Sequence, residues 1–292
     1  MLKNIGSIEN QGYELSIESD NLTGAFSWTT AFNIAFNRNK VLELGGEEYK
    51  EMAEGDGHLK TGSVRRLIVG EPIGVFYGYR FDGIFQNEEE CKQQTSSASP
   101  IGVGLRRYKD LNGDGKVDAA NDREILGDAN PKFFGGLTNT FAYKGFELNV
   151  FLQYSYGNKI LNYNAMELEN PTGGQNAYAD MVNRWTPENP SNIYPKATTN
   201  RALLVSDRFI EDGSYLKLKT LSLSYSFPKI NLKHIQGLRL YVTGQNLLTW
   251  TKYRGYDPEV SYRGASTLEA GEDFGGYPQS RTFMFGIKLD IK

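Results

Sequence analysis

The sequence predicts an all-β protein, and in particular a segment of an antiparallel transmembrane β-barrel with long loops. Three observations support this fold class. Apolar and polar residues alternate with a period of two over long stretches, which indicates strands with one apolar face. The 292 residues include 32 glycines, 18 tyrosines and 16 phenylalanines, a composition that suits strands and turns better than helices. Short connections between the predicted strands also alternate strictly with long ones.

Period-two alternation predicts seven long strands. They are expected at residues 13–18, 25–37, 133–143, 147–156, 214–227, 237–249 and 282–292. The clearest of them run about 10–13 residues. This is closer to the roughly 9–11 residues of a membrane-spanning β-strand than to the length of about 5–6 that is usual in soluble proteins. Leu216 and Leu218 have even numbers but Leu221 and Leu223 have odd numbers, so we expect a bulge near Thr220.

The connections predict which strand ends lie together. The short ones are 19–24, 144–145 and 228–236, and the long ones are 38–132, 157–213 and 250–281. In an antiparallel meander this alternation places all short turns at one end and all long loops at the other. Outer-membrane barrels have the same asymmetry, with short periplasmic turns and long extracellular loops, so the C-terminus is expected to be periplasmic. Two short strands are expected inside the first long loop, at 63–69 and 74–81.

The composition excludes several function classes. A net charge of -3 argues against a nucleic-acid-binding protein, which would have a basic excess. The single cysteine, Cys91, cannot form an internal disulfide, and the two histidines, His58 and His234, lie far apart in the sequence. No apolar run is long enough for a secretory signal or a membrane helix. No carboxylate pair and no nucleophile with a nearby histidine stands out, so we expect no catalytic activity.

One motif predicts a metal site. In the stretch DLNGDGKVDAAND at 110–122, oxygen-bearing side chains occupy alternate positions and Gly115 permits a sharp turn. Loops of this kind supply the six to eight oxygen ligands that calcium prefers. The expected ligands are the side chains of Asp110, Asn112, Asp114 and Asp118, the backbone carbonyl of Lys116 and, if the chain bulges, Asp122. The ion would have a structural role. The alternative is a solvent-exposed turn without a metal, because Asp, Asn and Gly are common turn residues.

Aromatic residues of the long loops are candidates for stacking on the apolar faces of sugar rings. The candidates are Trp185, Tyr194, Tyr253, Tyr256 and Tyr277. For each of them the alternative is packing within its own loop.

Four segments resemble a known family when they are taken together and in order. They are GEPIGVFYGY at 70–79 with DGIF at 82–85, YKDLNGDGKVD at 108–118 with GDANP at 127–131, RWTPENP at 184–190 with IEDGSYLK at 210–217, and GQNL at 244–247 with GYDPEV at 255–260. This set is similar to the C-terminal part of the SusC/RagA family of TonB-dependent outer-membrane transporters of Bacteroidetes. The resemblance covers nearly the whole chain.

The resemblance implies more than the periodicity does. It implies that residues 1–292 supply about seven strands of a barrel with about 22 strands, without the N-terminal signal, plug and TonB box of the family. It further implies import of a glycan, oligosaccharide or peptide across the outer membrane, together with a SusD-like surface lipoprotein and with TonB. Outer-membrane lipid would surround the strands. The alternative function is a soluble β-rich carbohydrate-binding or polysaccharide-degrading domain with a structural calcium site.

Overall fold

The computed structural model describes residues 6–52, 55, 57–59, 61–170, 176–199, 203–228, 235–260, 262–264 and 266–291. Most of the predicted short link at 228–236 therefore lies outside the described residues, because 229–234 are not among them. All other predicted strands and turns fall on described residues, apart from the last residue of the strand expected at 282–292.

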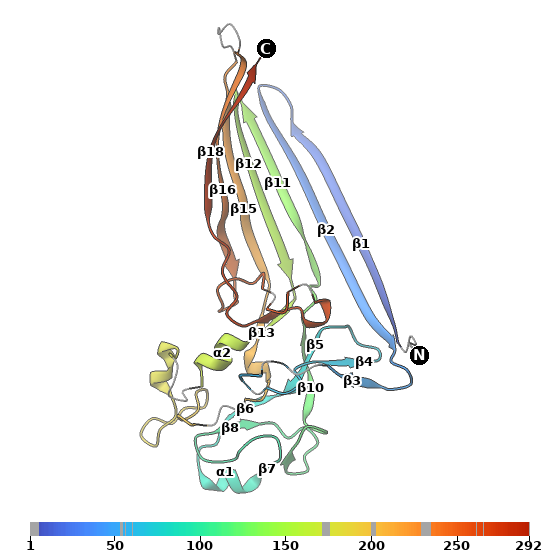
Figure 1. Cartoon of the computed structure of the whole chain (residues 1–292), viewed down its shortest axis with the longest axis vertical. Helices are drawn as coiled ribbons and strands as arrows, with labels where there is room; N and C mark the ends of the chain where they lie inside the picture. The colour runs from blue at the N-terminus through green and yellow to red at the C-terminus, as the bar shows by residue number, and fades with distance from the viewer. Residues whose placement is uncertain are drawn as a thin grey trace.

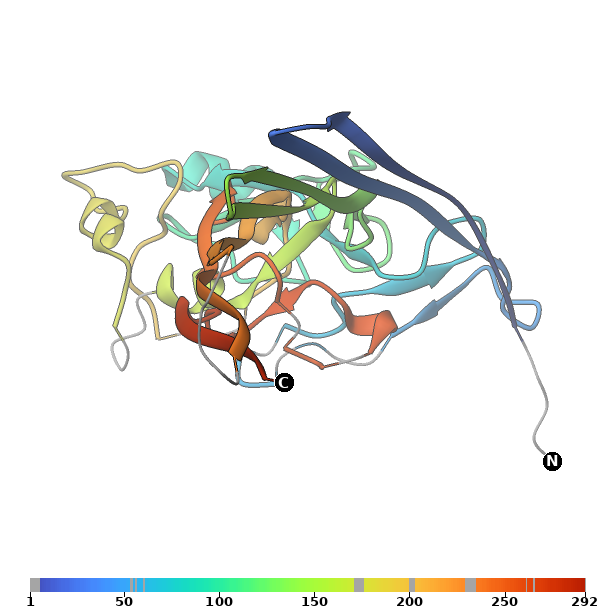
Figure 2. The same ribbon diagram turned by 90° about the horizontal axis from the view of Figure 1, so that it is seen from above.

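Seven long strands pair in chain order into one antiparallel sheet, which confirms the predicted meander (Figure 1). The strands are β1 (Ser7–Leu22), β2 (Phe26–Glu43), β11 (Phe133–Tyr143), β12 (Phe146–Tyr156), β15 (Tyr215–Ser226), β16 (Ile235–Thr251) and β18 (Thr282–Ile291). Seen from above, the strands follow an arc from dark blue β1 to dark red β18 (Figure 2).

The first two strands are longer than the sequence predicted. β1 begins at Ser7, which pairs with Glu43 near the end of β2, although the prediction placed these strands at 13–18 and 25–37. The additional residues are largely polar, so they carry no apolar alternation. Strand pairing uses backbone N–H and C=O groups, which every non-proline residue provides, and it therefore continues where the side-chain pattern stops.

The register gives the sheet one apolar and one polar face, because directly paired residues of antiparallel strands project to the same side. One ladder across six strands contains Trp28, Phe141, Leu148, Leu223, Val242 and Phe285. The neighbouring ladder contains Asp20, Thr29, Thr140, Asn149, Ser222 and Thr243. We call the two sides the apolar face and the polar face. Both follow the alternation that predicted the strands.

The predicted bulge lies next to Thr220. Thr220 pairs with Phe151 and Leu218 with Leu152, so Lys219 is the extra residue of β15. The neighbouring strand β16 is irregular at the same level, and its Asn246 has a positive φ of 53°. The bulge keeps leucines of both parities on the apolar face.

The described short connections lie at one end of the sheet, and the long loops lie at the other end (Figure 1). Between β11 and β12 the turn consists of Lys144 and Gly145, whose φ angles are 46° and 89°. Positive φ at both positions is typical of the tight turn that matches the twist of a hairpin. The C-terminal end of β18 lies at the short-turn end, as predicted (Figure 1).

The three long connections, 44–132, 157–214 and 252–281, form a packed structure that we call the loop body. Its strands are β3 (Tyr49–Glu51), β4 (Arg66–Ile68), β5 (Val75–Tyr79), β6 (Phe81–Ile84), β7 (Thr95–Ser96), β8 (Arg106–Tyr108), β9 (Lys116–Val117), β10 (Arg123–Asp128), β13 (Lys159–Asn162), β14 (Ile210–Asp212) and β17 (Glu272–Asp273). Its helices are α1 (Glu88–Gln93) and α2 (Tyr163–Leu168), with 3-10 turns η1 (Ala179–Asn183), η2 (Asp207–Phe209) and η3 (Thr267–Glu269). β4 and β5 correspond to the short strands expected at 63–69 and 74–81. Among the described residues, no helix is both long and apolar enough to cross a membrane.

Candidate functional site

The loop body has a hydrophobic core of its own, to which the long loops contribute together. Its buried members come from positions that are distant in the sequence: Leu59, Val64, Phe76, Ala129, Leu161, Tyr163, Ala165, Met166, Leu203, Val205 and Phe209. Phe274 of the third loop packs against this cluster. β13 of the second loop also pairs in parallel with β17 of the third, through Leu161 and Glu272. The three long loops therefore fold together as one unit and are not independent surface loops.

A buried ion pair joins the first loop to the third. The Arg65 Nε donates to Glu272 Oε1 over 3.0 Å, and both side chains are only 2% exposed. The Arg65 guanidinium also donates to the carbonyls of Gly74 and Ala270. Tyr163 donates its hydroxyl proton to the second Glu272 oxygen over 3.3 Å. Burial and the nearby Glu272 carboxylate raise the pKa of Tyr163, so this hydroxyl stays protonated as a donor.

A second charged cluster surrounds Glu169, whose side chain is 1% exposed. Arg208 reaches one carboxylate oxygen at 2.7 Å and Arg254 the other at 2.9 Å. Arg254 also pairs with Glu211 of β14 at 2.8 Å. Two arginines thus compensate the buried Glu169 carboxylate, as a buried charge requires. This cluster ties the second loop to the start of the third.

The polar face of the sheet holds the third loop in place. Lys217 of β15 is 2% exposed and donates to Asp257 at 2.6 Å and to Glu259 at 2.5 Å. Lys219, the bulge residue, donates to the same Glu259 carboxylate at 2.9 Å. Burial by itself raises the pKa of Glu259, but the hydrogen bonds from Lys217 and Lys219 outweigh it and lower the pKa. These ion pairs therefore fix the GYDPEV segment, residues 255–260, against the polar face of the sheet.

The predicted metal loop is curled by its own hydrogen bonds. Asp110 accepts the backbone N–H groups of Gly113 and Gly115, both at 2.7 Å. Asp114 accepts from the Lys116 N–H at 2.8 Å, and the Lys116 ammonium donates to Asp118 at 3.0 Å. The hydrogen bond from Lys116 lowers the pKa of Asp118. Asn112 is exposed and its side chain donates to Asp114.

Asp122 has a different environment from the other predicted ligands. Its side chain is fully buried, and its oxygens accept the backbone N–H groups of Leu111 and Asp118, both at 2.7 Å. It therefore closes the two ends of the loop by hydrogen bonding. Among the described residues, no group of three or more His, Cys, Asp and Glu side chains is arranged to hold a metal ion. The calcium site consequently stays a prediction from the sequence.

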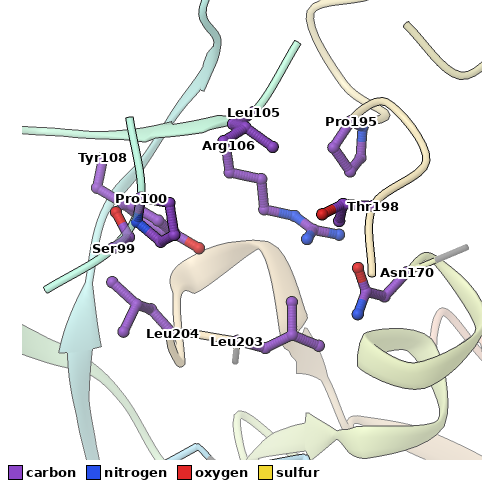
Figure 3. A pocket seen from close by; sticks show the side chains of 10 residues that line it. All are labelled: Ser99, Pro100, Leu105, Arg106, Tyr108, Asn170, Pro195, Thr198, Leu203 and Leu204. Carbon is purple, nitrogen blue, oxygen red and sulfur yellow. The ribbon is translucent and has the colours of Figure 1, made fainter. Parts of the chain in front are cut away.

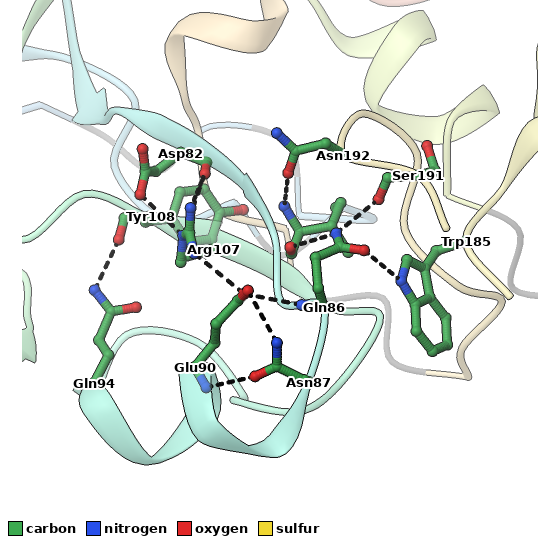
Figure 4. A network of polar contacts seen from close by, with 11 residues as sticks. Asp82, Gln86, Asn87, Glu90, Gln94, Arg107, Tyr108, Trp185, Ser191 and Asn192 are labelled. Carbon is green, nitrogen blue, oxygen red and sulfur yellow. Dashed lines mark hydrogen bonds and ion pairs between the residues drawn. The ribbon is translucent and has the colours of Figure 1, made fainter. Parts of the chain in front are cut away.

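The predicted loop aromatics divide into packed and exposed residues. Trp185 donates its indole N–H to Gln86 at 3.0 Å, within a polar network shown in Figure 4. Tyr194 donates to Asp180, and the buried Tyr253 donates to Asp273. Tyr256 and Tyr277 are 78% and 91% exposed. Of the five candidates, only Tyr256 and Tyr277 have rings that are largely exposed to solvent. The other three are held by contacts within the loop body.

The same network shows how the tip of the loop body is ordered. Arg107 of β8 bonds Asp82 at 2.9 Å and Glu90 of α1 at 3.3 Å (Figure 4). Asn87 caps α1 by accepting the Glu90 backbone N–H. These contacts join the first turn of α1 to β6 and β8.

Comparison with known proteins supplies the context for this architecture. No protein-family model matches the chain. The chain is 40% identical, over 99% of its length, to "TonB-dependent receptor P3" of Formosa agariphila, and it covers 29% of that protein. It is 28% identical, over 100% of its length, to "TonB-dependent receptor SusC" of Bacteroides thetaiotaomicron, and it covers 27% of it. The solved structure of the RagAB peptide transporter superposes with a TM-score of 0.76 and 25% identity, over 98% of this chain and 30% of that one.

These comparisons confirm the resemblance seen in the sequence: over nearly its whole length, the chain is similar to TonB-dependent receptors of the SusC/RagA family. It spans less than a third of the length of these relatives. TonB-dependent receptors of this family are outer-membrane β-barrel proteins, and the seven-stranded sheet is a segment of such a barrel. This favours the barrel segment over the alternative of a soluble β-rich domain. The names of the SusC/RagA relatives describe receptors and a transporter, which fits the expectation that the chain is not an enzyme.

The sequence did not single out the charged residues that organise the loop body. Four of these residues are buried and ion-paired: Arg65, Glu169, Lys217 and Glu272. No sequence motif indicates which residue pairs with each of them. A weak signal was present at Arg65 and Arg66, where two charged residues interrupt an apolar strand pattern. The partner Glu272 is 207 positions away in the sequence.

Proposed function

We propose that this chain forms part of the barrel wall and of the surface loops of an outer-membrane importer. The observation that carries the proposal is the sheet itself, which is apolar on one side, polar on the other, and continuous with one folded loop body. In this arrangement the apolar face contacts lipid and the polar face lines the aqueous interior. Import would be an activity of a whole receptor, and this chain spans less than one third of the length of its relatives.

The orientation follows from the unequal connections. We place the loop body outside the cell and the short turns, with the C-terminus, in the periplasm. Support comes from the general asymmetry of outer-membrane barrels, whose periplasmic turns are short and whose extracellular loops are long. The loop body also carries solvent-accessible ion pairs, Arg80 with Glu124 and Arg107 with Asp82, which suits an aqueous location.

Cysteine labelling of whole cells tests this orientation. With Cys91 replaced by serine, a cysteine at exposed Glu188 of the second loop should react with a membrane-impermeant maleimide. A cysteine at Lys144 of the β11–β12 turn should react only after the outer membrane is permeabilised. The reverse pattern would show that the receptor is oriented the other way. Equal labelling at both sites in intact cells would show that the ends of the sheet are not separated by a membrane.

The substrate and partners are part of the proposal. A glycan, oligosaccharide or peptide substrate is proposed from the family resemblance, and one similar solved structure is described as a peptide transporter. A SusD-like surface lipoprotein would dock on the loop body, and TonB would act through a part of the receptor outside this chain. Uptake of labelled oligosaccharides and peptides by cells with and without the receptor gene would identify the substrate class.

We also propose that the loop at 110–122 binds calcium. Its donors are all oxygen atoms, and the Asp110 bonds to Gly113 and Gly115 already give the loop the curled shape that such sites need. Asp110, Asn112, Asp114, Asp118 and the Lys116 carbonyl would hold the ion. Asp118 would have to exchange its contact with the Lys116 ammonium for the ion. Calcium would then order the loop and have no chemical role.

Asp114→Ala in the intact receptor should weaken calcium binding about tenfold or more, because replacement of groups in or next to a metal shell typically costs 10–100-fold in affinity. Calorimetric titration of the purified receptor measures this. Glu89→Ala is the matched control, since Glu89 is an exposed carboxylate of α1 outside the loop. If the unmodified receptor binds no calcium at millimolar concentration, the loop is a metal-free turn.

A further inference from the structure

A small pocket within the loop body contains two buried polar groups that lack partners. It is lined by Ser99, Pro100, Leu105, Arg106, Tyr108, Asn170, Pro195, Thr198, Leu203 and Leu204, and its volume is about 90 Å³. The lining residues come from the first and second long loops. Figure 3 shows the Arg106 guanidinium and the Asn170 carboxamide pointing into the pocket, with leucine and proline side chains around them.

Arg106 is the charged group of this pocket. Its side chain belongs to β8, and the residue is 8% exposed. One nitrogen, Nη2, donates to the backbone carbonyl of Glu169 at 3.0 Å, but the Nε–H has no acceptor. No carboxylate among the described residues lies within ion-pairing distance of it. The Glu169 carboxylate is already held by Arg208 and Arg254.

This makes Arg106 different from the other deeply buried cations of the described chain. Arg65 has Glu272 as its partner, and Lys217 has Asp257 and Glu259. Burying an unpaired charge is strongly unfavourable, and a paired carboxylate normally offsets this cost. Burial and the like charge of Arg208 lower the pKa of Arg106, yet an arginine remains protonated at neutral pH. The pocket therefore contains a permanent positive charge that lacks an anion.

Asn170 adds a second requirement. It is 8% exposed, and its side-chain oxygen Oδ1 has no donor. An oxyanion alone would satisfy the Arg106 Nε–H but would leave the Asn170 oxygen unpaired. A carboxylate that carries a neighbouring hydroxyl or amide N–H would satisfy both groups. Leu105, Leu203 and Leu204 form apolar walls around these two polar groups.

We propose that this pocket is a binding subsite for one carboxylate group of an acidic solute, with Arg106 as the anion contact and Asn170 as the acceptor of an adjacent O–H or N–H. Such a group occurs at the C-terminal end of a peptide and in a sugar acid. That the solute is also the imported cargo rests on the proposed function. Binding to the pocket does not depend on import.

Binding to the purified full-length receptor tests the proposal. The probes are N-acetylglycine, which mimics a peptide end, and glucuronate, which is a sugar acid. The uncharged methyl ester of N-acetylglycine is the matched control ligand. We expect one or both acids to bind in the pocket and the ester not to bind, and the tighter acid identifies the source. Acids and ester that bind equally well, or acids that do not bind, would overturn the proposal.

Variants assign the binding to the pocket. Arg106→Gln should weaken binding of the acid at least about tenfold, as expected for loss of a hydrogen bond to a charged group. Arg107→Gln is the matched control, because Arg107 is the next residue of β8 but bonds Asp82 and Glu90 instead of the pocket. If Arg106→Gln does not fold, Asn170→Asp replaces it: the new carboxylate supplies the missing anion and should abolish binding.

A density map of the full receptor with the acid bound gives an independent check. The carboxylate should lie against the Arg106 Nε. A pocket filled by another segment of the receptor's own chain would overturn the proposal, because the unpaired groups would then have an internal partner. If binding is as expected but the acid is not imported, the subsite stands and only the proposed cargo is wrong.

Discussion

Glu272→Gln should destabilise the loop body by about 3–5 kcal/mol, the typical cost of removing one partner of a buried ion pair. The substitution keeps the shape of the side chain but leaves the Arg65 guanidinium, 2% exposed, without a negative charge. It also removes the charged acceptor of the Tyr163 hydroxyl. Amide hydrogen exchange of the full receptor measures the effect, since protection factors report the free energy of local opening. Amides around β13 and β17 should exchange at least a hundredfold faster.

Glu269→Gln is the matched control for this experiment. It makes the same chemical change three residues earlier, at a partly exposed side chain of η3 that forms no ion pair among the described residues. Exchange in the loop body should then stay close to that of the unmodified receptor. Similar acceleration by both substitutions would mean that Arg65 is not held by Glu272 in solution.

Leu152→Arg should cost about 2–4 kcal/mol of barrel stability, the range measured for a basic residue at the bilayer midplane on a lipid-facing position. Leu152 lies in the middle of β12 and pairs with Leu137 and Leu218, so an arginine there meets only apolar neighbours on its face. Equilibrium folding of the receptor into lipid vesicles at increasing urea concentration measures the loss.

Asn149→Arg is the control for this substitution on the same strand. Asn149 projects to the polar face, where it pairs with Thr140 and Ser222. An arginine at this position reaches the aqueous interior and should cost much less than one at Leu152. Equal costs at the two positions would show that the two faces do not see lipid and water as proposed.

The sheet was predictable because each strand residue has only two environments. Alternation in the sequence therefore indicates both where a strand lies and which face each residue is on. The extra residue Lys219 was also detectable, because the leucines before it have even numbers and those after it have odd numbers. Alternation did not reveal the full length of β1, since its outer residues are polar and pair only through their backbone. The calcium motif was visible for a similar reason, because its residues are neighbours in the sequence.

The interior of the loop body was not predictable in this way. Its partners come from different loops, so the sequence near Arg65 contains no information about Glu272, and the sequence near Lys217 contains none about Asp257. The missing partner of Arg106 could be recognised only in the folded structure, where Arg208 and Arg254 hold the nearby Glu169 carboxylate.

The core of the loop body contains residues from all three long connections, so we expect the sheet and the loop body to fold in a defined order. Three hairpins of the sheet, β1–β2, β11–β12 and β15–β16, have short connections and can form with a small loop-closure cost. The loop body has the opposite property. Its core includes Leu59 of the first connection, Phe274 of the third packs against that core, and Arg65 pairs with Glu272 only when the first and third connections have come together. Contacts between such distant positions form slowly. The outer surface of the receptor should therefore mature late and as one cooperative step, after the wall that supports it.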